Sequence, residues 1–306
     1  MSSLENGRAF SFLVNPTSGG GAAPGAVVPV ARALREAGAV VDVTYSPGPQ
    51  AMARLVDEAV DRGDVVVSVG GDGMLSSLAG LVAGRGATFG VVPAGRGNDF
   101  ARMLGVPEDP EEQARMLLEA DVRRIDLLSV TGLGERRMVA GSVYAGVDAR
   151  AAEIVDRATW LPRSLQYPYA ALRALASYRP GHYRVVVDGE AREYDAATVV
   201  VANSAYYGKG MQIAPPASVE DGVLDVVVIE AASRLALMRS LPKVYDGAHV
   251  DLDEVTVLSG RRVEITGSAR KPIPVGGDGE PLGPLPALGS APAVVEVSPG
   301  ALGIIC

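Results

Sequence analysis

The sequence of 306 residues predicts an α/β domain with a parallel sheet, followed by a larger antiparallel β domain. Two observations predict this fold class. Up to about Ile125, short runs of apolar β-branched residues alternate with segments of helical periodicity, which indicates a parallel sheet covered by helices on both faces. Beyond Ile125, short Val- and Thr-rich runs are separated by turn residues, as in a β-sandwich. We therefore expect domains at 1–127 and 128–306.

The first domain is predicted element by element from apolar periodicity and from the glycine or proline residues that interrupt it. Apolar residues four apart within the second expected helix, such as Met52, Val56 and Val60, illustrate the helical spacing. The expected strands are 9–14, 40–44, 64–69 and 88–92, and the expected helices are 26–37, 50–62, 75–83, 100–104 and 110–120.

The second domain is predicted from short runs of residues with strong strand propensity. One stretch, near 149–178, has helical character and is expected to be an insert in the β domain. Packing of the C-terminal tail on the first domain is a further expectation that stays open. The expected strands are 139–144, 183–187, 198–202, 224–229, 255–258, 263–266 and 294–297.

Composition excludes several classes of protein. Hydrophobic residues make up 48% of the chain and charged residues 21%, which is typical of a soluble globular protein. The net charge of −8 argues against wholesale nucleic-acid binding. Cys306 is the only cysteine, so no disulfide forms within one chain. Because no apolar run is long enough for a membrane span and no signal peptide is evident, we expect a cytoplasmic location.

Three glycine-rich loops, 15–21, 70–73 and 95–98, each follow a predicted strand. The carboxyl ends of parallel strands share one sheet edge, where ligands bind. Backbone amides of such loops cradle phosphate, yet the second loop also carries Asp72. A carboxylate beside phosphate is explained by a Mg²⁺ ion between them. The alternative is a tight turn in which Asp72 bonds its own backbone.

Two further acids favour the metal interpretation. Asp99 follows the next strand and Asp126 lies where the first domain ends. Asn98 or Asp99 could instead cap the helix that begins at Phe100. Other catalytic motifs are absent: the chain has no G-x-S-x-G elbow, no Walker loop and no complete G-x-G-x-x-G.

Together the loops resemble the diacylglycerol kinase catalytic domain family of lipid kinases. The resemblance rests on five motifs spread over nearly the whole chain. GGDG alone is only moderately specific, whereas the set of five is strong. They are NPTSGGG (15–21), GGDG (70–73), PAGRGNDFAR (93–102), APPASVEDGVLDVVVI (214–229) and GGDGEP (276–281).

The resemblance implies a Rossmann-like α/β nucleotide-binding domain and a β-sandwich domain, with the active site in the cleft between them. It implies ATP as phosphoryl donor, Mg²⁺ as cofactor and a lipid hydroxyl as acceptor, with diacylglycerol the first expectation. The nucleotide-binding residues implied are Asn15, Pro16, Ser18, Gly71, Asp72, Gly73, Gly95, Arg96, Asn98 and Asp99.

The same resemblance implies roles for acids along the chain. Asp278 would be the general base, with Glu280 beside it and Asp72 close to the reaction. Asp72, Asp99 and Asp126 would surround the catalytic Mg²⁺, while Asp221 and the carbonyl group of Val223 would bind a structural Mg²⁺.

Two Asp-Gly-Glu triplets occur, at 188–190 and 278–280, and Asp-Gly is a common hairpin turn. We interpret Asp188 as only a turn because strand-like segments flank it on both sides. Asp278 lies in a stretch rich in glycine and proline and is assigned to function, mostly on the resemblance.

The sequence departs from the family pattern at Met74 and Arg96, where threonine is usual, and at Gly20, where some members have lysine. Arg96 could supply a phosphate-binding cation. Two alternatives therefore stay open. One is a kinase of the same fold for a sphingoid base, another glycerolipid or NAD; the other is a regulator that binds nucleotide or lipid with weakened catalysis.

Residues 148–184 hold six arginines and three acids, together with Trp160, the only tryptophan. Basic residues beside interfacial aromatic residues suit a transient contact with an anionic membrane surface. A solvated helix face packed on the core is the competing interpretation. The expected partner is therefore a lipid substrate at a membrane, with no nucleic acid, and a homodimer stays open.

Overall fold

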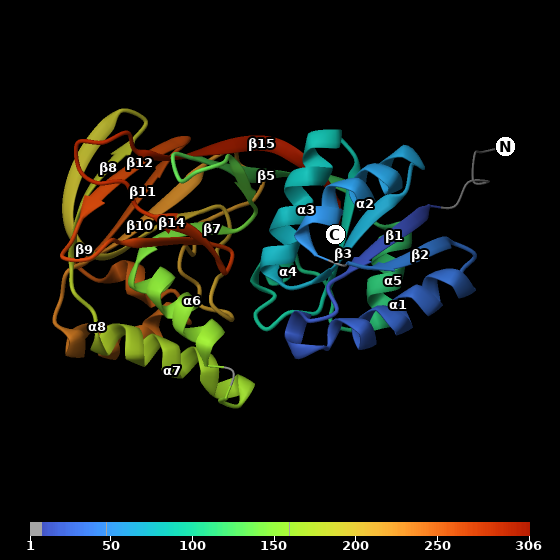
Figure 1. Cartoon of the computed structure of the whole chain (residues 1–306), viewed down its shortest axis with the longest axis horizontal. Helices are drawn as coiled ribbons and strands as arrows, with labels where there is room; N and C mark the ends of the chain where they lie inside the picture. The colour runs from blue at the N-terminus through green and yellow to red at the C-terminus, as the bar shows by residue number, and fades with distance from the viewer. Residues whose placement is uncertain (1–7, 47, 159) are drawn as a thin grey trace. The chain divides into compact units, whose positions relative to one another are not determined.

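The computed structural model describes residues 8–46, 48–158 and 160–306. Their contacts divide the chain into two compact units (Figure 1). The first runs to Ile125 and includes Gly300–Cys306 from the far end of the chain, and the second is Asp126–Pro299. The sequence predicted a boundary two residues later, after residue 127.

The first unit is built on a parallel sheet in the order β15-β4-β3-β1-β2. Its own strands are β1 (Ala9–Val14), β2 (Val40–Tyr45), β3 (Val65–Gly70) and β4 (Thr88–Pro93). The end of β15 (Ala293–Ile305) completes it, because Gly303 and Ile304 pair with Thr88 and Phe89. The predicted parallel sheet is thus confirmed.

Helices cover both faces of this sheet, with α1 and α5 on one face and α2 and α3 on the other (Figure 1). Every residue of β3 is buried, as expected of a central parallel strand. The helices are α1 (Ala23–Glu36), α2 (Pro49–Asp61), α3 (Asp72–Arg85), α4 (Asp99–Met103) and α5 (Pro110–Glu119), with a 3-10 turn, η1 (Ser18–Gly20).

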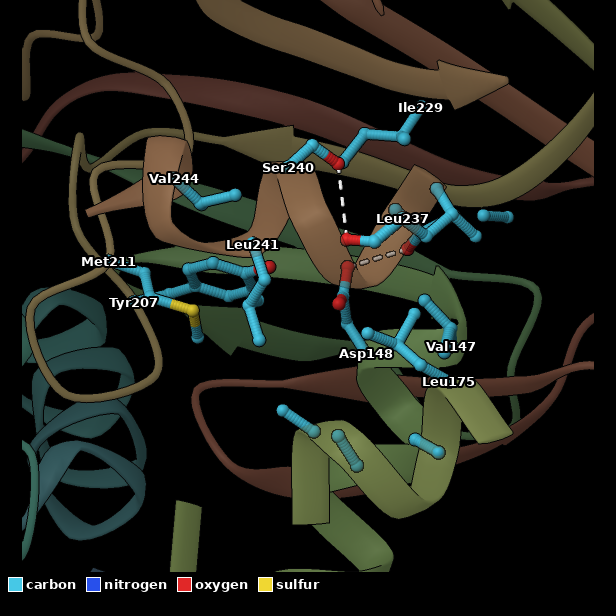
Figure 2. A pocket seen from close by; sticks show the side chains of 15 residues that line it. Val147, Asp148, Leu175, Tyr207, Met211, Ile229, Leu237, Ser240, Leu241 and Val244 are labelled. Atoms are coloured by element: carbon cyan, nitrogen blue, oxygen red, sulfur yellow. Dashed lines mark hydrogen bonds between the residues drawn. The ribbon is translucent and has the colours of Figure 1, made fainter. Parts of the chain in front are cut away.

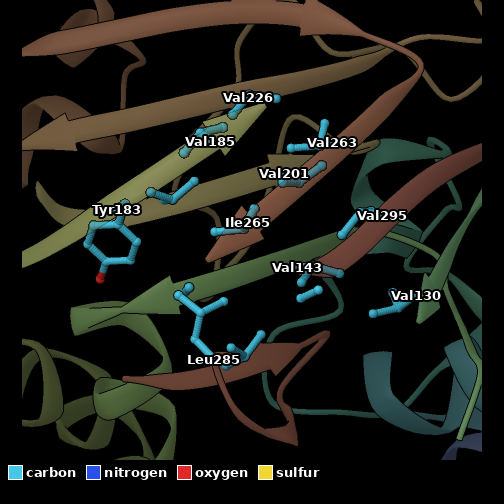
Figure 3. Close-up of a cluster of buried hydrophobic side chains, with 14 of the residues drawn as sticks. Val130, Val143, Tyr183, Val185, Val201, Val226, Val263, Ile265, Leu285 and Val295 are labelled. Carbon is cyan, nitrogen blue, oxygen red and sulfur yellow. The ribbon is translucent and has the colours of Figure 1, made fainter. Parts of the chain in front are cut away.

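The second unit is dominated by antiparallel pairing, in the order β14-β13-β7-β9-β8-β12-β15, with β10 beside β9 and β11 beside β10. Its core consists mainly of valine, leucine and isoleucine side chains from these strands, together with Tyr183 (Figure 3). The strands are β5 (Val122–Thr131), β6 (Arg137–Val139), β7 (Ser142–Gly146), β8 (Gly181–Val187), β9 (Glu190–Ala202), β10 (Leu224–Glu230), β11 (Val255–Gly260), β12 (Arg262–Ser268), β13 (Pro274–Gly277) and β14 (Glu280–Pro284).

The predicted helical insert is two helices, α6 (Val147–Arg157) and α7 (Arg163–Ala176), which pack on each other. A third helix, α8 (Arg234–Ser240), packs on α7 and continues into the 3-10 turn η2 (Leu241–Val244). Another 3-10 turn, η3 (Ala248–Asp251), follows. The sequence did not predict α8, whose seven residues are too few for a periodic pattern to be distinctive.

One predicted strand is wrong. The run 139–144 was expected to be continuous, but β6 ends at Val139 and β7 begins at Ser142. Between them, the backbone N–H groups of Ala140 and Gly141 donate to the carboxylate of Asp278 instead of to a neighbouring strand. The break therefore has a specific cause, a side chain that competes for the ladder donors.

Helix α3 also begins earlier than expected, at Asp72 rather than near Leu75. A single residue, Gly71, separates it from β3. Asp72 therefore lies in the first turn of a helix rather than in an extended loop, and a negative charge is favourable there because the helix dipole is positive at its N-terminus.

Candidate active site

The three glycine-rich loops of the first unit contact one another. The N–H group of Ala94 donates to the carbonyl oxygen of Gly70 over 2.8 Å. A Cβ atom on Gly95 would lie 2.4 Å from Cα of Gly71, and one on Gly19 would lie 2.4 Å from the carbonyl oxygen of Ala94. Glycine is therefore required at these positions for the loops to pack this closely.

Each loop is also held internally. The side-chain oxygen of Asn15 accepts hydrogen bonds from the N–H and hydroxyl groups of Thr17. The side-chain oxygen of Asn98, a residue with φ of 54°, accepts from the N–H group of Gly95 over 2.7 Å. Ser18 Oγ lies close to Gly71, 3.6 Å from where its Cβ would be. Pro16 and Arg96 are exposed.

The carboxylates of Asp72 and Asp99 flank Gly97. A Cβ atom on Gly97 would lie 3.3 Å from Asp72 Oδ2 and 2.8 Å from Asp99 Oδ2. Asp72 Oδ1 accepts a hydrogen bond from the N–H group of Phe100, in the first turn of α4. Asp99 is buried and its Oδ1 pairs with Arg102 at 2.7 Å. Thus Asp72 links its own loop to the next one, rather than closing a local turn.

The electrostatics of Asp72 are dominated by its surroundings. Burial raises the pKa of the Asp72 carboxyl group, and nearby backbone N–H groups, first that of Phe100, oppose the rise. A buried carboxylate, whose ionisation is disfavoured by its surroundings, is strongly stabilised when a cation lies beside it. The chemistry of Asp72 and Asp99 fits Mg²⁺, which prefers one or two carboxylates together with substrate phosphates and water.

Met74 occupies the position after the GGDG loop. Its Sδ atom would lie 2.8 Å from a Cβ atom on Gly70, so the side chain covers the end of β3. A thioether is at most a weak hydrogen-bond acceptor and donates nothing to a phosphate. Backbone N–H groups in the first turn of α3 and the exposed Arg96 are among the possible donors at this edge.

A second group of predicted residues lies in the second unit, around the break between β6 and β7. Asp278 Oδ2 accepts from the N–H groups of Ala140 and Gly141, and its Oδ1 accepts from that of Ser142. Three backbone donors hold the carboxylate in one orientation, as a preorganised base requires.

Asn203 connects the backbone that binds the Asp278 carboxylate to Asp126. Its side-chain amide donates to the carbonyl oxygens of Asp126 and Ala140, over 3.0 and 2.8 Å. Asp126 Oδ2 in turn accepts from the N–H group of Gly222 over 2.7 Å. The structure thus brings the predicted residues Asp126 and Asp278 into one hydrogen-bonded network. Sequence reasoning missed Asn203, which directly follows the apolar end of β9 and whose contacts across the sheet no local pattern reveals.

Asp278 and Asp188 have the same backbone geometry. Both have positive φ, 46° and 48°, and each is followed by a glycine with φ near 90°, as in a two-residue hairpin turn. Asp188 likewise accepts hydrogen bonds from the N–H groups of Arg261 and Arg262. Local conformation therefore does not distinguish them. Glu280 begins β14 and is exposed.

The predicted structural metal site lies at a turn. Asp221 Oδ1 accepts from the N–H group of Val223 over 3.0 Å, around Gly222 with φ of 69°. Asp225, on β10, is buried beside this turn, and burial raises the pKa of its carboxyl group. Within residues 8–46, 48–158 and 160–306, no group of three or more His, Cys, Asp or Glu side chains has the arrangement of a metal site.

The second unit also contains a pocket that the sequence did not predict (Figure 2). Asp148, Tyr207 and Thr198 are among the residues that line it. These residues lie far apart in the chain and are joined only by the packing of helices on the sheet. As for membrane spans, none of the helices in the described part of the chain is both long and apolar enough for one.

Comparison with known proteins identifies two family models. Residues 9–130 match the diacylglycerol kinase catalytic domain, and residues 141–306 match the YegS C-terminal NAD kinase beta sandwich-like domain. A diacylglycerol kinase from Mycobacterium tuberculosis is 34% identical over 292 residues, which cover 93% of each chain. A "Probable lipid kinase YegS-like" from Stenotrophomonas maltophilia is 28% identical and covers 79% of this chain and 80% of its own.

The fold also has solved relatives. A crystal structure of a diacylglycerol kinase from Bacillus anthracis matches with a TM-score of 0.70 at 18% identity, and covers 99% of this chain and 98% of its own. At that identity the likeness concerns the fold alone. It agrees with the expected α/β domain followed by a β-sandwich-like domain.

Proposed function

Because the chain belongs to the diacylglycerol kinase family of lipid kinases, we propose that it transfers the γ-phosphoryl group of ATP to diacylglycerol, giving phosphatidic acid. A kinase family implies ATP as the donor. The observation that carries the proposal is the meeting of the three glycine-rich loops around Asp72 at the start of α3. Backbone N–H groups and a helix N-terminus suit a phosphate chain.

Phosphoryl transfer depends on positioning and charge neutralisation rather than covalent chemistry. In our proposal, the loops at 15–21, 70–73 and 95–98 orient the phosphates, and Arg96 adds a positive charge near them. Asp72 and Asp99 would hold Mg²⁺, with Asp126 as a further acid of the same set. The ion would neutralise charge on the transferring group.

Asp278 acts as the general base in this proposal and takes the proton of the acceptor hydroxyl group as the new bond to phosphorus forms. Its three backbone donors fix its orientation, so that it does not need to reorganise during the reaction. Glu280 is placed beside it in sequence. Asp221 and the carbonyl group of Val223 would bind the separate structural Mg²⁺.

The test is phosphoryl transfer from γ-labelled ATP with Mg²⁺ to diacylglycerol, a sphingoid base, monoacylglycerol or NAD, with the lipids in mixed micelles. We expect labelled phosphatidic acid, abolished in Asp72→Asn and when Mg²⁺ is chelated. Transfer to another acceptor instead would replace diacylglycerol but keep the kinase. Nucleotide binding with no transfer to any acceptor would favour the regulator. The Met74 side chain, which covers Gly70, is the observation that supports this alternative.

We also propose that the protein works in the cytoplasm and reaches its substrate at an anionic membrane surface through α7 and the segment before it. Trp160, Leu165 and Leu172 expose 71%, 52% and 50% of their surface, and Arg157 and Arg173 nearby are exposed as well. Exposed apolar residues beside cations suit an interface with anionic lipid.

Vesicle cosedimentation tests this membrane contact. We expect binding to vesicles that contain phosphatidylglycerol, weaker binding to phosphatidylcholine alone, and loss of binding in Trp160→Ala with Leu172→Asp. Leu288→Asp, on an exposed leucine in the loop before β15, is the matched control. Equal binding by both variants would disprove the assignment to α7.

A further inference from the structure

The turn that carries Asp278 lies in different surroundings from the turn at Asp188. The N–H groups that donate to the Asp278 carboxylate belong to the buried residues 140–142. Asp188 accepts from the exposed residues 261–262, and residues 188–190 are exposed as well. Since the two turns share their backbone conformation, the difference between them lies in the side chains that pack against each turn.

One side chain that contacts the Asp278 turn is Tyr144, on β7, which is only 5% exposed. Its hydroxyl oxygen accepts a hydrogen bond from the N–H group of Gly279, the residue after Asp278, over 2.9 Å. The ring of Tyr207 packs edge-on against the Tyr144 ring, with the centroids 6.0 Å apart. Tyr144 therefore holds the backbone of the turn, while residues 140–142 hold its carboxylate.

Glycine at position 276 allows Tyr144 to reach the turn. Gly276 on β13 pairs with Tyr144 on β7, and a Cβ atom on Gly276 would lie 2.6 Å from Cε2 of the tyrosine ring. The ring thus occupies the space that a side chain at position 276 would take. Gly141 is comparable, because its Cβ atom would lie 2.7 Å from Oδ1 of Asp278. Two glycines therefore allow both contacts with the turn to form.

The second side chain is Asn203, fully buried directly after β9. Its amide nitrogen donates to the carbonyl oxygens of Asp126 and Ala140, and its backbone N–H group donates to that of Gly141 over 2.8 Å. Its amide oxygen is buried without a hydrogen-bond partner among the residues that the structure describes. Because an unpaired buried acceptor opposes folding, stability alone does not explain an asparagine here.

We propose that Tyr144 and Asn203 are positioning residues for Asp278, which keep the turn and the N–H donors at 140–142 in the geometry that aims the carboxylate at the acceptor hydroxyl group. The proposal rests on the general base proposed above and adds the residues that orient it. Removal of either side chain should let the carboxylate adopt other orientations. A misplacement of about 1 Å is enough to slow a reaction strongly.

The test measures the kinetics of phosphoryl transfer in single variants. Tyr144→Phe keeps the ring and removes the hydroxyl group, and Asn203→Ala removes both bonds of the side chain. We expect kcat to fall about tenfold in each, which corresponds to about 1.4 kcal/mol. The KM for ATP should change less than twofold, because the glycine-rich loops are untouched. Gly276→Ala, which displaces the Tyr144 ring, should lower kcat to a similar extent.

Tyr194→Phe is the matched control. The hydroxyl group of Tyr194, on β9 of the same unit, is buried and has no hydrogen-bond partner within the described ranges of the chain. Its removal should leave kcat unchanged within twofold. Melting temperatures identify any variant that loses activity by unfolding, and if Asn203→Ala fails to fold, Tyr144→Phe decides.

A double variant separates positioning from a general structural role. Asp278→Asn lacks the base, so the addition of Tyr144→Phe should lower its residual kcat by less than twofold, whereas independent effects would multiply. Multiplied losses would overturn the proposal, and so would a normal kcat in folded Tyr144→Phe. The latter result beside an inactive Asp278→Asn would leave the proposed kinase function intact. Normal transfer by Asp278→Asn would reject the base itself, and its positioning with it.

Amide hydrogen exchange tests the same geometry without turnover. Tyr144→Phe should speed exchange at Gly279, and Asn203→Ala should speed it at residues 140–142, because these N–H groups become less restrained. Tyr194→Phe should change neither. Unchanged exchange in both test variants would overturn the proposal, whether or not the unmodified protein phosphorylates any of the acceptors.

Discussion

At the residue scale, the two Asp-Gly-Glu turns allow Asp278, the proposed general base, to be compared with Asp188, which we interpret as structural. Asp278 and Asp188 share positive φ and both accept backbone N–H groups. Removal of either carboxylate should therefore cost a similar free energy of unfolding, about 1–3 kcal/mol, because N–H donors lose their partner. Only the reactive residue should also affect the chemical step.

We predict that Asp278→Asn lowers kcat by about 10²–10⁴-fold, the usual contribution of a general base, while Asp188→Asn leaves kcat nearly unchanged. Steady-state kinetics with γ-labelled ATP, together with urea denaturation of both variants, provides the measurement. Equal losses of activity in the two variants would mean that Asp278 acts only through the turn.

A second residue-scale prediction concerns Asp72, whose pKa is raised by burial. For a carboxyl group with a raised pKa in the folded state, ionisation opposes folding. Its contribution to stability is complete below the unfolded pKa and is lost as the pH rises through the folded pKa. Without ligand, Asp72→Asn should therefore have a higher Tm than the unmodified protein at pH 7 and the same Tm near pH 3.

Asp72→Asn should at the same time lose phosphoryl transfer, because an amide does not replace a carboxylate toward Mg²⁺. The amide oxygen still accepts from Phe100, so the link between the loops persists. Calorimetry from pH 3 to 8 gives the stability part. A lower Tm at neutral pH in Asp72→Asn would show that the Asp72 carboxylate stabilises the empty loops.

Single residues also differ in how well the sequence predicts their positions. Gly71, Asp72, Gly95 and Asn98 were predicted to lie at one sheet edge, and they do, because parallel strands align their carboxyl ends. The bond from Asn203 to Asp126 spans 77 residues. Only the pairing of distant strands creates it, and no local spacing predicts that pairing.

At the element scale, the loops after β3 and β4 approach each other closely. This contact makes Gly95, in the second of these loops, different from Gly84, a glycine within α3. Gly95 has no room for a Cβ atom because the backbone of Gly71 is in the way, whereas Gly84, near the end of α3, has open space around it. Glycine is thus required at the first position by packing and is merely tolerated at the second.

We predict opposite effects of the same substitution at these two sites. Gly95→Ala should separate the loops and weaken binding of a fluorescent ATP analogue at least tenfold. Gly84→Ala should leave binding unchanged and stabilise the protein by about 1 kcal/mol through helix propensity. Titration and chemical denaturation measure both. Unchanged nucleotide affinity in Gly95→Ala would show that the close packing of these loops is not needed to bind the nucleotide.

The predicted elements of the first unit agree with the structure to within a few residues, and for β1 the bounds coincide. In the second unit, β9 and β15 each extend eight residues beyond the predicted runs 198–202 and 294–297. The errors occur where tertiary contacts override local preference. The carboxylate of Asp278 interrupts the expected strand 139–144, and α8 is too short to produce a periodic signal.

At the scale of the whole molecule, the last residues of the chain belong to the first unit. Leu302, Ile304 and Ile305 are fully buried there, and Ile304 pairs with β4. Burial of one such side chain contributes about 1.5–3 kcal/mol. Their removal would also expose the edge of β4, which favours aggregation.

We therefore predict that deletion of residues 302–306 abolishes binding of an ATP analogue and lowers the Tm of the first unit. Cys306→Ser, which changes only the sulfur that lies 3.4 Å from Arg123, is the control and should behave as the unmodified protein. Differential scanning calorimetry and the binding titration measure the effect. A truncated chain with normal Tm and affinity would contradict the assignment of β15 to this sheet.

The route of β15 has a consequence for biosynthesis. The strand that completes the first sheet is translated after the whole of the second unit, although β1 to β4 leave the ribosome early. At about 5–20 residues per second, the nascent first unit waits on the order of ten seconds or more with the edge of β4 unpaired. A ribosome that stalls before residues 303–304 are made would therefore hold a chain whose first sheet lacks the strand beside β4.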